Sequence, residues 1–110
     1  MNIQIFGKKK CFDTKKAERY FKERGVKFQL VDILDKGLSH GEFTNVLKAV
    51  GGLEDIIDSK AKDYCLIQYL NDEDKEEKLV EMPKLYKTPI VRNGKKATVG
   101  HKPEVWKTWE

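Results

Sequence analysis

Two cysteines are the side chains of this sequence best suited to nucleophilic or redox chemistry. Cys11 follows an apolar run at residues 2–6 and precedes a segment with helical periodicity at residues 13–24. We expect that helix to begin at a capping residue, Asp13 or Thr14, so that the Cys11 sulfur faces the unpaired N–H groups of the first turn. Such a position stabilises a thiolate, which is the nucleophilic form of cysteine.

The field of a helix N-terminus predicts a moderately activated thiol at position 11. It stabilises a nearby anion by about 0.3 to 2 kcal/mol, which lowers the pKa of a thiol. The alternative for Cys11 is a small buried hydrophobic residue, and an exposed, basic loop favours the reactive role. The lysines around the cysteine add a weak, solvent-screened attraction; they are Lys8, Lys9, Lys10 and Lys15.

For the second cysteine, the packing role is favoured over the reactive role. Cys65 lies beside Leu66 and Ile67 in an apolar run that we predict to be helical. A free cysteine in such a run is usually a packing residue. We therefore expect Cys65 to fill space in the core.

The residue at position 14 decides which redox chemistry is possible. A Cys-x-x-Cys pair closes an internal disulfide, but here Thr14 stands where the second sulfur would be. Because a hydroxyl cannot resolve a mixed disulfide, turnover has to use Cys11 with an external thiol, or with Cys65 if the fold brings it close. Thr14 itself is expected to cap the helix.

Thr88-Pro89 stands at the start of a predicted strand at residues 88–92. Proline is tolerated at the start of a strand but not in its interior, and a cis peptide bond is plausible at this position. In a thioredoxin-like domain, this bond would face the Cys11 loop and shape a groove for an extended thiol substrate. His101 follows the last strand and is either a titrating partner of the thiolate or an ordinary loop residue.

Length and composition favour one domain, residues 1–110. The chain has 39% hydrophobic residues and a net charge of 22 − 18 = +4, so disorder is not expected. No run approaches the roughly 18 apolar residues of a membrane helix, and no signal segment is recognisable, so we expect a cytoplasmic protein with reduced thiols. Charge is +6 over residues 1–27, −7 over 28–83 and +5 over 84–110. If the two ends fold together, they form an electropositive surface.

The order of elements predicts an α/β fold. Strands at 2–6 and 26–33 flank the first helix and should be parallel, with a right-handed crossover. An acidic helical block at about 39–83 follows, with a capping box at Ser39 and Glu42 and helical segments at 53–57, 61–70 and 73–82. Strands at 88–92 and 97–99 form a hairpin around Asn93-Gly94, and a closing helix begins near Pro103. This is the order of a thioredoxin-like fold with a small mixed four-stranded sheet and an inserted helical block.

The motifs, taken together, resemble those of the ArsC/Spx family over nearly the whole chain. They are residues 9–17 around Cys11, Glu54-Asp55-Ile56-Ile57, Thr88-Pro89-Ile90-Val91 and Val99-Gly100. The resemblance implies a monothiol oxidoreductase related to glutaredoxins and arsenate reductases, with Cys11 as nucleophile. Lys10, Thr14, Lys15, Thr88, Pro89 and His101 are its expected thiol- or anion-binding residues. The implied partner is glutathione or another low-molecular-weight thiol, or glutaredoxin, with no metal and no other cofactor.

Arsenate itself is not the expected substrate. The resemblance implies an arginine triad that holds the oxyanion, and its positions carry Asp58, Thr88 and His101 here. Lysines lie one or two residues away, at 60, 87 and 102, but an ammonium cannot replace the planar, bidentate guanidinium.

The resemblance also implies an alternative from another class. Spx-type proteins are transcription regulators that bind the RNA polymerase α subunit around the positions of Gly51 and Gly52. Their usual Cys-x-x-Cys switch is absent here. Direct nucleic-acid binding is not expected, because no predicted helix concentrates Lys and Arg with base-reading side chains.

Overall fold

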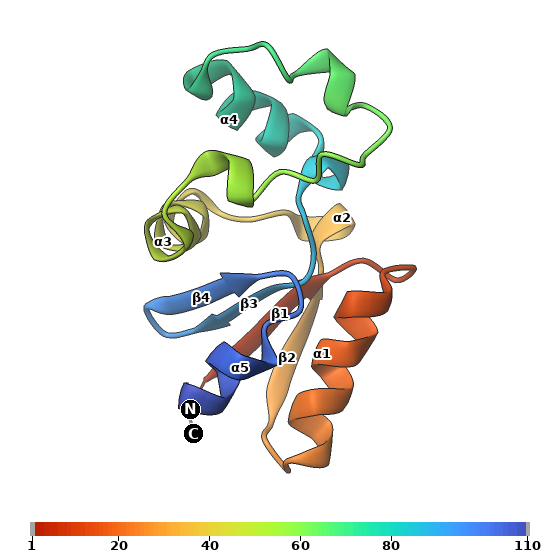
Figure 1. Cartoon of the computed structure of the whole chain (residues 1–110), viewed down its shortest axis with the longest axis vertical. Coiled ribbons are helices and arrows are strands. Elements are labelled where there is room, and N and C mark those ends of the chain that lie inside the picture. Colours follow the sequence, from red (N-terminus) through yellow and green to blue (C-terminus); the bar gives the residue numbers. More distant parts are fainter. Residues whose placement is uncertain (1, 110) are drawn as a thin grey trace.

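A βαβ unit forms the first part of the molecule. The computed structural model describes residues 2–109, in which β1 (Ile3–Gly7) leads through α1 (Phe12–Glu23) to β2 (Phe28–Asp32). The two strands are parallel, with Ile3 opposite Phe28 and Gly7 opposite Asp32. Their carboxyl ends therefore meet at one edge of the sheet, where the loop that carries Cys11 begins (Figure 1).

The C-terminal part completes the sheet. The hairpin of β3 (Ile90–Asn93) and β4 (Lys96–Val99) is antiparallel, and β3 pairs antiparallel with β1 to give the order β2-β1-β3-β4. The chain then enters α5 (Pro103–Trp106), with proline in its first turn as predicted, and the 3₁₀ turn η4 (Lys107–Trp109). The expected α/β fold with a mixed four-stranded sheet is confirmed.

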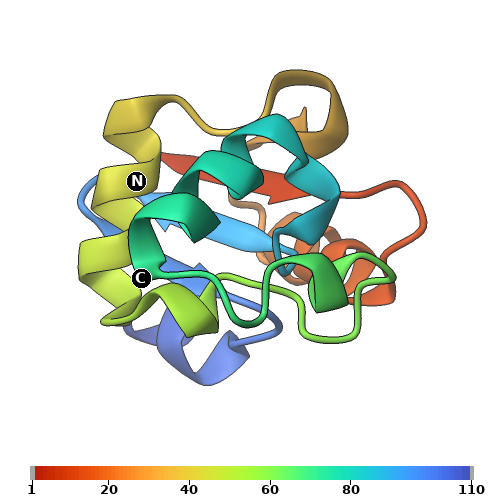
Figure 2. The same ribbon diagram turned by 90° about the horizontal axis from the view of Figure 1, so that it is seen from above.

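The sheet separates two hydrophobic cores. On one face α1 and α5 cover Ile3, Ile5 and Val91, and Trp106 is fully buried there. On the other face lie α3 (His40–Val50), α4 (Asp72–Glu81) and the segments between them (Figures 1 and 2). This second core is larger and is centred on Phe6 and Ile90 of the sheet.

The inserted block contains less helix than the sequence suggested. The short helix α2 (Ile33–Lys36) precedes the block, which comprises α3, α4 and three 3₁₀ turns, η1 (Leu53–Asp55), η2 (Tyr64–Leu66) and η3 (Pro83–Leu85). The prediction of a helix over 61–70 is wrong. The Asp58 side chain accepts a hydrogen bond from the N–H of Lys60, and a series of three-residue turns follows, so the apolar run never forms a buried helical stripe. Tyr69 is consequently 91% exposed.

Local signals were more reliable in the first half of the block. Ser39 and Glu42 form the predicted capping box, and α3 ends at Gly51 in a left-handed conformation. Arg92 fastens α3 to the sheet, because its guanidinium donates to Asn45 Oδ1 at 2.9 Å and to Gln4 Oε1 at 2.6 Å. Across the described residues, every helix is too short or too polar to span a bilayer.

The hydrogen bond that seats α5 on the sheet gives a stability prediction. Trp106 Nε1 donates to Thr98 Oγ1 at 2.7 Å, with both residues buried. Thr98→Val keeps the volume and leaves the indole N–H unpaired, so we expect a loss of about 1–3 kcal/mol of unfolding free energy. Urea denaturation measures it. Thr108→Val, at an exposed hydroxyl bonded to the Val105 carbonyl, is the control and should change little. Equal losses in both variants would contradict this account.

Candidate functional site

Cys11 is itself the residue that caps α1. The helix begins at Phe12, and its cap is two or three residues earlier than expected, because Cys11 has extended dihedral angles and its carbonyl accepts the N–H of Lys15 at 3.3 Å. The prediction that Asp13 or Thr14 caps the helix is therefore wrong. The correction brings the sulfur closer to the free N–H groups of the first turn than the sequence indicated.

The sulfur is half-buried and surrounded by hydrogen-bonding groups. Sγ lies 3.7 Å from the Thr88 carbonyl oxygen, to which the protonated thiol can donate. Burial raises the pKa of Cys11, but hydrogen bonds from the side chains of Thr14 and Thr88 and from the N–H groups of Thr14 and Asp13 outweigh it, and the net pKa is lowered. The expected activation of this thiol thus comes from hydroxyls as well as from the helix terminus.

Thr14 supports the thiol from within the helix. It is buried in the first turn, and its hydroxyl accepts the N–H of Lys8 at 3.4 Å while it interacts with the Cys11 sulfur. Gly7 makes this position possible, because a Cβ there would overlap the Thr14 side chain. Close packing between β1 and α1 thereby fixes a hydroxyl beside the Cys11 sulfur.

Lys8 ties the Cys11 loop to the segment before β3. Its Nζ donates to the carbonyl oxygens of Lys84 and Tyr86, each at 2.8 Å. Burial lowers the pKa of this lysine, while the charges of Asp58 and Cys11 oppose that effect. The ammonium is therefore a positioned charge that the thiolate experiences, unlike the exposed lysines 9 and 10. Its contacts with distant carbonyls have no signal in the sequence.

Thr88 and Pro89 form the opposite wall. Their peptide bond is cis, as the sequence made plausible, and both residues are buried. The Pro89 carbonyl accepts the N–H of Gly100 at 2.8 Å, which joins this bend to the end of β4. The structure thus brings Cys11, Thr14 and Thr88 together.

An open groove of about 350 Å³ adjoins the sulfur. Its lining residues are Cys11, Asp13, Glu54, Asp55, Ile57, Asp58, Ser59, Lys60, Lys87 and Thr88. Four carboxylates and two ammonium groups line it, so the thiol opens into a groove of mixed charge. The acidic middle of the chain folds over the basic ends, which a count of charge along the sequence does not reveal.

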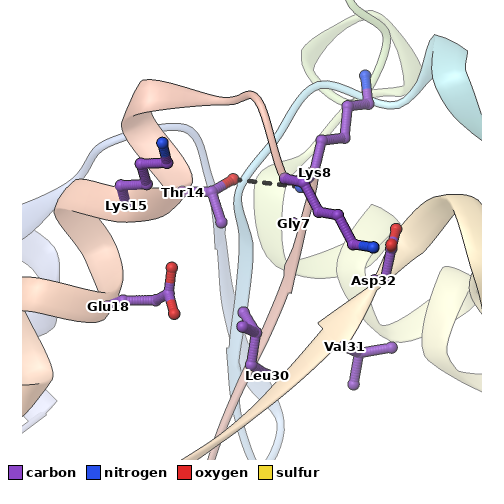
Figure 3. Close-up of a pocket in the computed structure, with 9 residues that line it drawn as sticks. Gly7, Lys8, Thr14, Lys15, Glu18, Leu30, Val31 and Asp32 are labelled. Carbon is purple, nitrogen blue, oxygen red and sulfur yellow. Dashed lines mark hydrogen bonds between the residues drawn. The ribbon is translucent and has the colours of Figure 1, made fainter.

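Several residues expected at the site lie elsewhere. Lys10 is exposed in the loop and is not among the groove residues. Lys15 lines a separate, largely apolar cavity of about 350 Å³ between α1 and β2, together with Leu30 and Glu18 (Figure 3). His101 is exposed and packs edge-on against Trp106, with ring centroids 5.6 Å apart, which favours the loop-residue interpretation.

The second cysteine is not a core residue. Cys65 is exposed in η2, and its sulfur lies 3.9 Å from the Lys62 carbonyl oxygen. The packing interpretation is therefore wrong, for the same reason that the helix over 61–70 is absent. Both cysteines are free thiols. Within residues 2–109, no group of three or more His, Cys, Asp and Glu side chains could hold a metal ion.

Gly51 and Gly52 lie between α3 and the groove. Gly51 has φ 86°, whereas Gly52 is extended with φ −172°, a conformation open to any residue. A Cβ on Gly52 would make only an ordinary contact, 3.6 Å from Asp55 Oδ2. Because Asp55 also lines the groove, the surface at the two glycines adjoins the thiol site.

Comparisons with known proteins agree with this architecture. The model of the ArsC family matches residues 6–109. The global transcriptional regulator Spx 2 of Oceanobacillus iheyensis is 31% identical over 106 residues, which cover 92% of this chain and 78% of that protein.

Two solved structures share the fold. An arsenate reductase from Vibrio cholerae superposes with a TM-score of 0.84 at 22% identity, covering 96% of this chain and 94% of that one. An ArsC family related protein from Bacteroides fragilis gives a TM-score of 0.87 at 20% identity, with 100% of both chains covered. At these identities the superpositions establish the thioredoxin-like fold and do not select a reaction.

The role of the Thr14 hydroxyl can be measured directly. Thr14→Val removes a hydrogen bond to the thiolate, so the pKa of Cys11 should rise and its alkylation at pH 7 should slow by roughly two- to tenfold, since such a bond contributes about 0.5–1.5 kcal/mol. Iodoacetamide kinetics against pH, with Cys65 replaced by Ser in every variant, follow one thiol. The two rates should converge at alkaline pH, where both thiols are ionised.

Thr44→Val is the matched control, because the Thr44 hydroxyl bonds only to its own helix, at the His40 carbonyl. A pH profile for Thr14→Val that coincides with that of the control would show that this hydroxyl does not activate Cys11.

Proposed function

The chain belongs to the ArsC family, and on that premise we propose that it is a monothiol oxidoreductase that exchanges disulfides with glutathione or a related low-molecular-weight thiol. The observation that carries the proposal is the Cys11 thiol, which has a lowered pKa and opens into a groove. A thiolate fraction at neutral pH combined with access for a second sulfur is what thiol–disulfide exchange requires.

The reaction runs through one protein sulfur. The Cys11 thiolate attacks the glutathione sulfur of a mixed disulfide, a new S–S bond forms, and the partner leaves as a thiolate that takes a proton from water. A second glutathione thiolate then attacks the sulfur of the bound glutathione and releases glutathione disulfide and the Cys11 thiolate. The two electrons that reduce the mixed disulfide come from two glutathione molecules. One of these is already part of the mixed disulfide, and the other enters as the free thiol.

The residues around the sulfur suit these steps. The hydroxyls of Thr14 and Thr88 stabilise Cys11 as the attacking thiolate and again as the leaving thiolate. Thr14 has no sulfur with which to close an internal disulfide, so the mixed disulfide waits for an external thiol. A reducing compartment with a thiol pool, such as the cytoplasm, is where this cycle can operate.

Arsenate is a poor match for the same groove. Asp58 projects negative charge into it, Thr88 is occupied with the sulfur, and His101 lies against Trp106 outside the lining residues. A tetrahedral oxyanion therefore has no planar, bidentate cation to hold it.

Turnover with a small mixed disulfide tests the proposal. With glutathione and hydroxyethyl disulfide, formation of glutathione disulfide should be abolished in Cys11→Ser and retained in Cys65→Ser, the control at the other free thiol. Coupled oxidation of NADPH by glutathione reductase measures the rate. Arsenate, supplied with glutathione and glutaredoxin, should give no comparable rate. Turnover that survives in Cys11→Ser would contradict the proposal.

A second candidate function is a transcription regulator that binds the RNA polymerase α subunit. The 31% identity to Spx 2 favours it, and the surface at Gly51 and Gly52 is accessible beside η1. The missing Cys-x-x-Cys affects only a disulfide switch and leaves such binding possible.

Because Gly52 is extended and unobstructed, a substitution there tests the surface without disturbing the fold. In a pull-down with the C-terminal domain of the polymerase α subunit, Gly52→Arg should retain much less of that domain than the unmodified chain does. Gly52→Ala, the matched control, should retain it. Absence of binding by the unmodified chain removes this candidate.

A further inference from the structure

Two opposite charges that line the Cys11 groove, the Asp55 carboxylate and the Lys87 ammonium, have no ion-pair partner among the described residues, and neither has the Lys60 ammonium. Of its four carboxylates, Glu54 is paired with Lys75, Asp13 lies 3.8 Å from Lys16, and Asp58 accepts the N–H of Lys60. Within the described part of the chain, the Asp55 carboxylate has neither an ion-pair nor a hydrogen-bond partner.

Lys87 is the complementary cation. Its ammonium likewise has no carboxylate within 4 Å among residues 2–109. The backbone of Lys87 nevertheless lies beside the segment that follows Asp55. The N–H of Lys87 donates to the Ile56 carbonyl at 2.7 Å, and the N–H of Asp58 donates to the Leu85 carbonyl at 2.8 Å. These bonds flank an antiparallel bridge between Ile57 and Tyr86. Two opposite charges are therefore held on neighbouring, hydrogen-bonded segments without neutralising each other.

Both charges border a second cavity as well as the thiol groove. This cavity has a volume of about 440 Å³ and lies between the end of α3, β4 and α5. Asp55 and Lys87 are the residues that line both hollows. Thr88, next to Lys87 in the chain, contacts the Cys11 sulfur through its carbonyl. Cys11, Asp55 and Lys87 thus line one groove, and a group joined to the Cys11 sulfur would enter the hollow that the two charges border.

We propose that Asp55 and Lys87 form a subsite for an α-amino-acid headgroup, with Asp55 receiving the ammonium and Lys87 the carboxylate of a thiol whose sulfur bonds to Cys11. The proposal rests on the proposed function and adds a preference among its low-molecular-weight thiols and disulfides for those of the cysteine type, which carry a free ammonium and a free carboxylate close to the sulfur. Each exposed charge contributes modestly in water, so we expect a two- to fivefold effect per group.

Three small disulfides separate the contributions of the two charges. Cystine carries both headgroup charges, cystamine lacks the carboxylate, and 3,3′-dithiodipropionate lacks the ammonium. In each reaction the Cys11 thiolate attacks one sulfur, forms the mixed disulfide and releases the other half as a thiolate. Mass spectrometry of the Cys65→Ser chain gives the rate constant at Cys11 alone. Division by the rate for uncharged hydroxyethyl disulfide in the same variant removes changes in the pKa of the thiol.

We expect the normalised rate for cystine to fall by about two- to fivefold in Asp55→Asn and in Lys87→Gln. The normalised rate for cystamine should fall only in Asp55→Asn, and the normalised rate for dithiodipropionate should fall only in Lys87→Gln. The control Lys95→Gln, in the hairpin outside both cavities, should leave all three normalised rates unchanged. Normalised cystine rates that are equal in all variants would overturn the subsite, and so would a dithiodipropionate rate that depends on Lys60 rather than on Lys87.

A binding measurement separates this proposal from the proposed function. S-Methyl-L-cysteine has the headgroup but no reactive sulfur, and its titration should shift the backbone amide signals of residues 55 and 87 in ¹H–¹⁵N NMR spectra. 3-(Methylthio)propanoate should shift them less at the same concentration. Shifts without any exchange at Cys11 would retain the subsite and reject the oxidoreductase. Exchange with hydroxyethyl disulfide without these shifts would retain the oxidoreductase and reject the subsite.

Discussion

The balance between burial and hydrogen bonding at one sulfur atom sets the direction in which the pKa of Cys11 is shifted. Half-burial of Cys11 opposes ionisation, and it also protects the thiol from indiscriminate contact with solvent. The hydroxyls of Thr14 and Thr88 and the first N–H groups of α1 reverse that penalty. These groups come from a helix and from a bend some 70 residues away in the chain, so the lowered pKa is a property of the assembled fold.

The Cys11 loop and the Thr88-Pro89 bend are held together by polar contacts near the sulfur and by apolar packing in the large core. Lys8 uses its ammonium to bind two carbonyls of the 84–86 segment, which fixes the distance between the Cys11 loop and the Thr88-Pro89 bend. The bridge between Ile57 and Tyr86 then fixes the inserted block against the same bend. Since Ile57, Leu85 and Tyr86 also belong to the large buried core, the relative positions of these segments are set by packing as well as by hydrogen bonds.

The inserted block gives the thiol its particular surroundings. It covers one face of the sheet, and its 3₁₀ turn η1 brings acidic residues to a nucleophile that a lysine-rich loop carries. The mixed charge of the groove disfavours a simple oxyanion and suits ligands that carry both signs. The same turn adjoins Gly52, so a thiol substrate and a protein partner would meet neighbouring parts of one surface.

The sequence alone was sufficient for the strands, the capping box of α3 and the hairpin at Asn93-Gly94, because each depends on local periodicity or on residues a few positions apart. It failed over 61–70, where an apolar run without a helical stripe forms successive turns and exposes Cys65. Thr14 and Thr88 were expected near the thiol, but only the tertiary structure decided that Lys8 binds the carbonyls of the 84–86 segment and that Asp55 and Lys87 line the same groove unpaired. Those relations join residues far apart in the chain, and neither propensity nor spacing encodes the packing that brings their segments together.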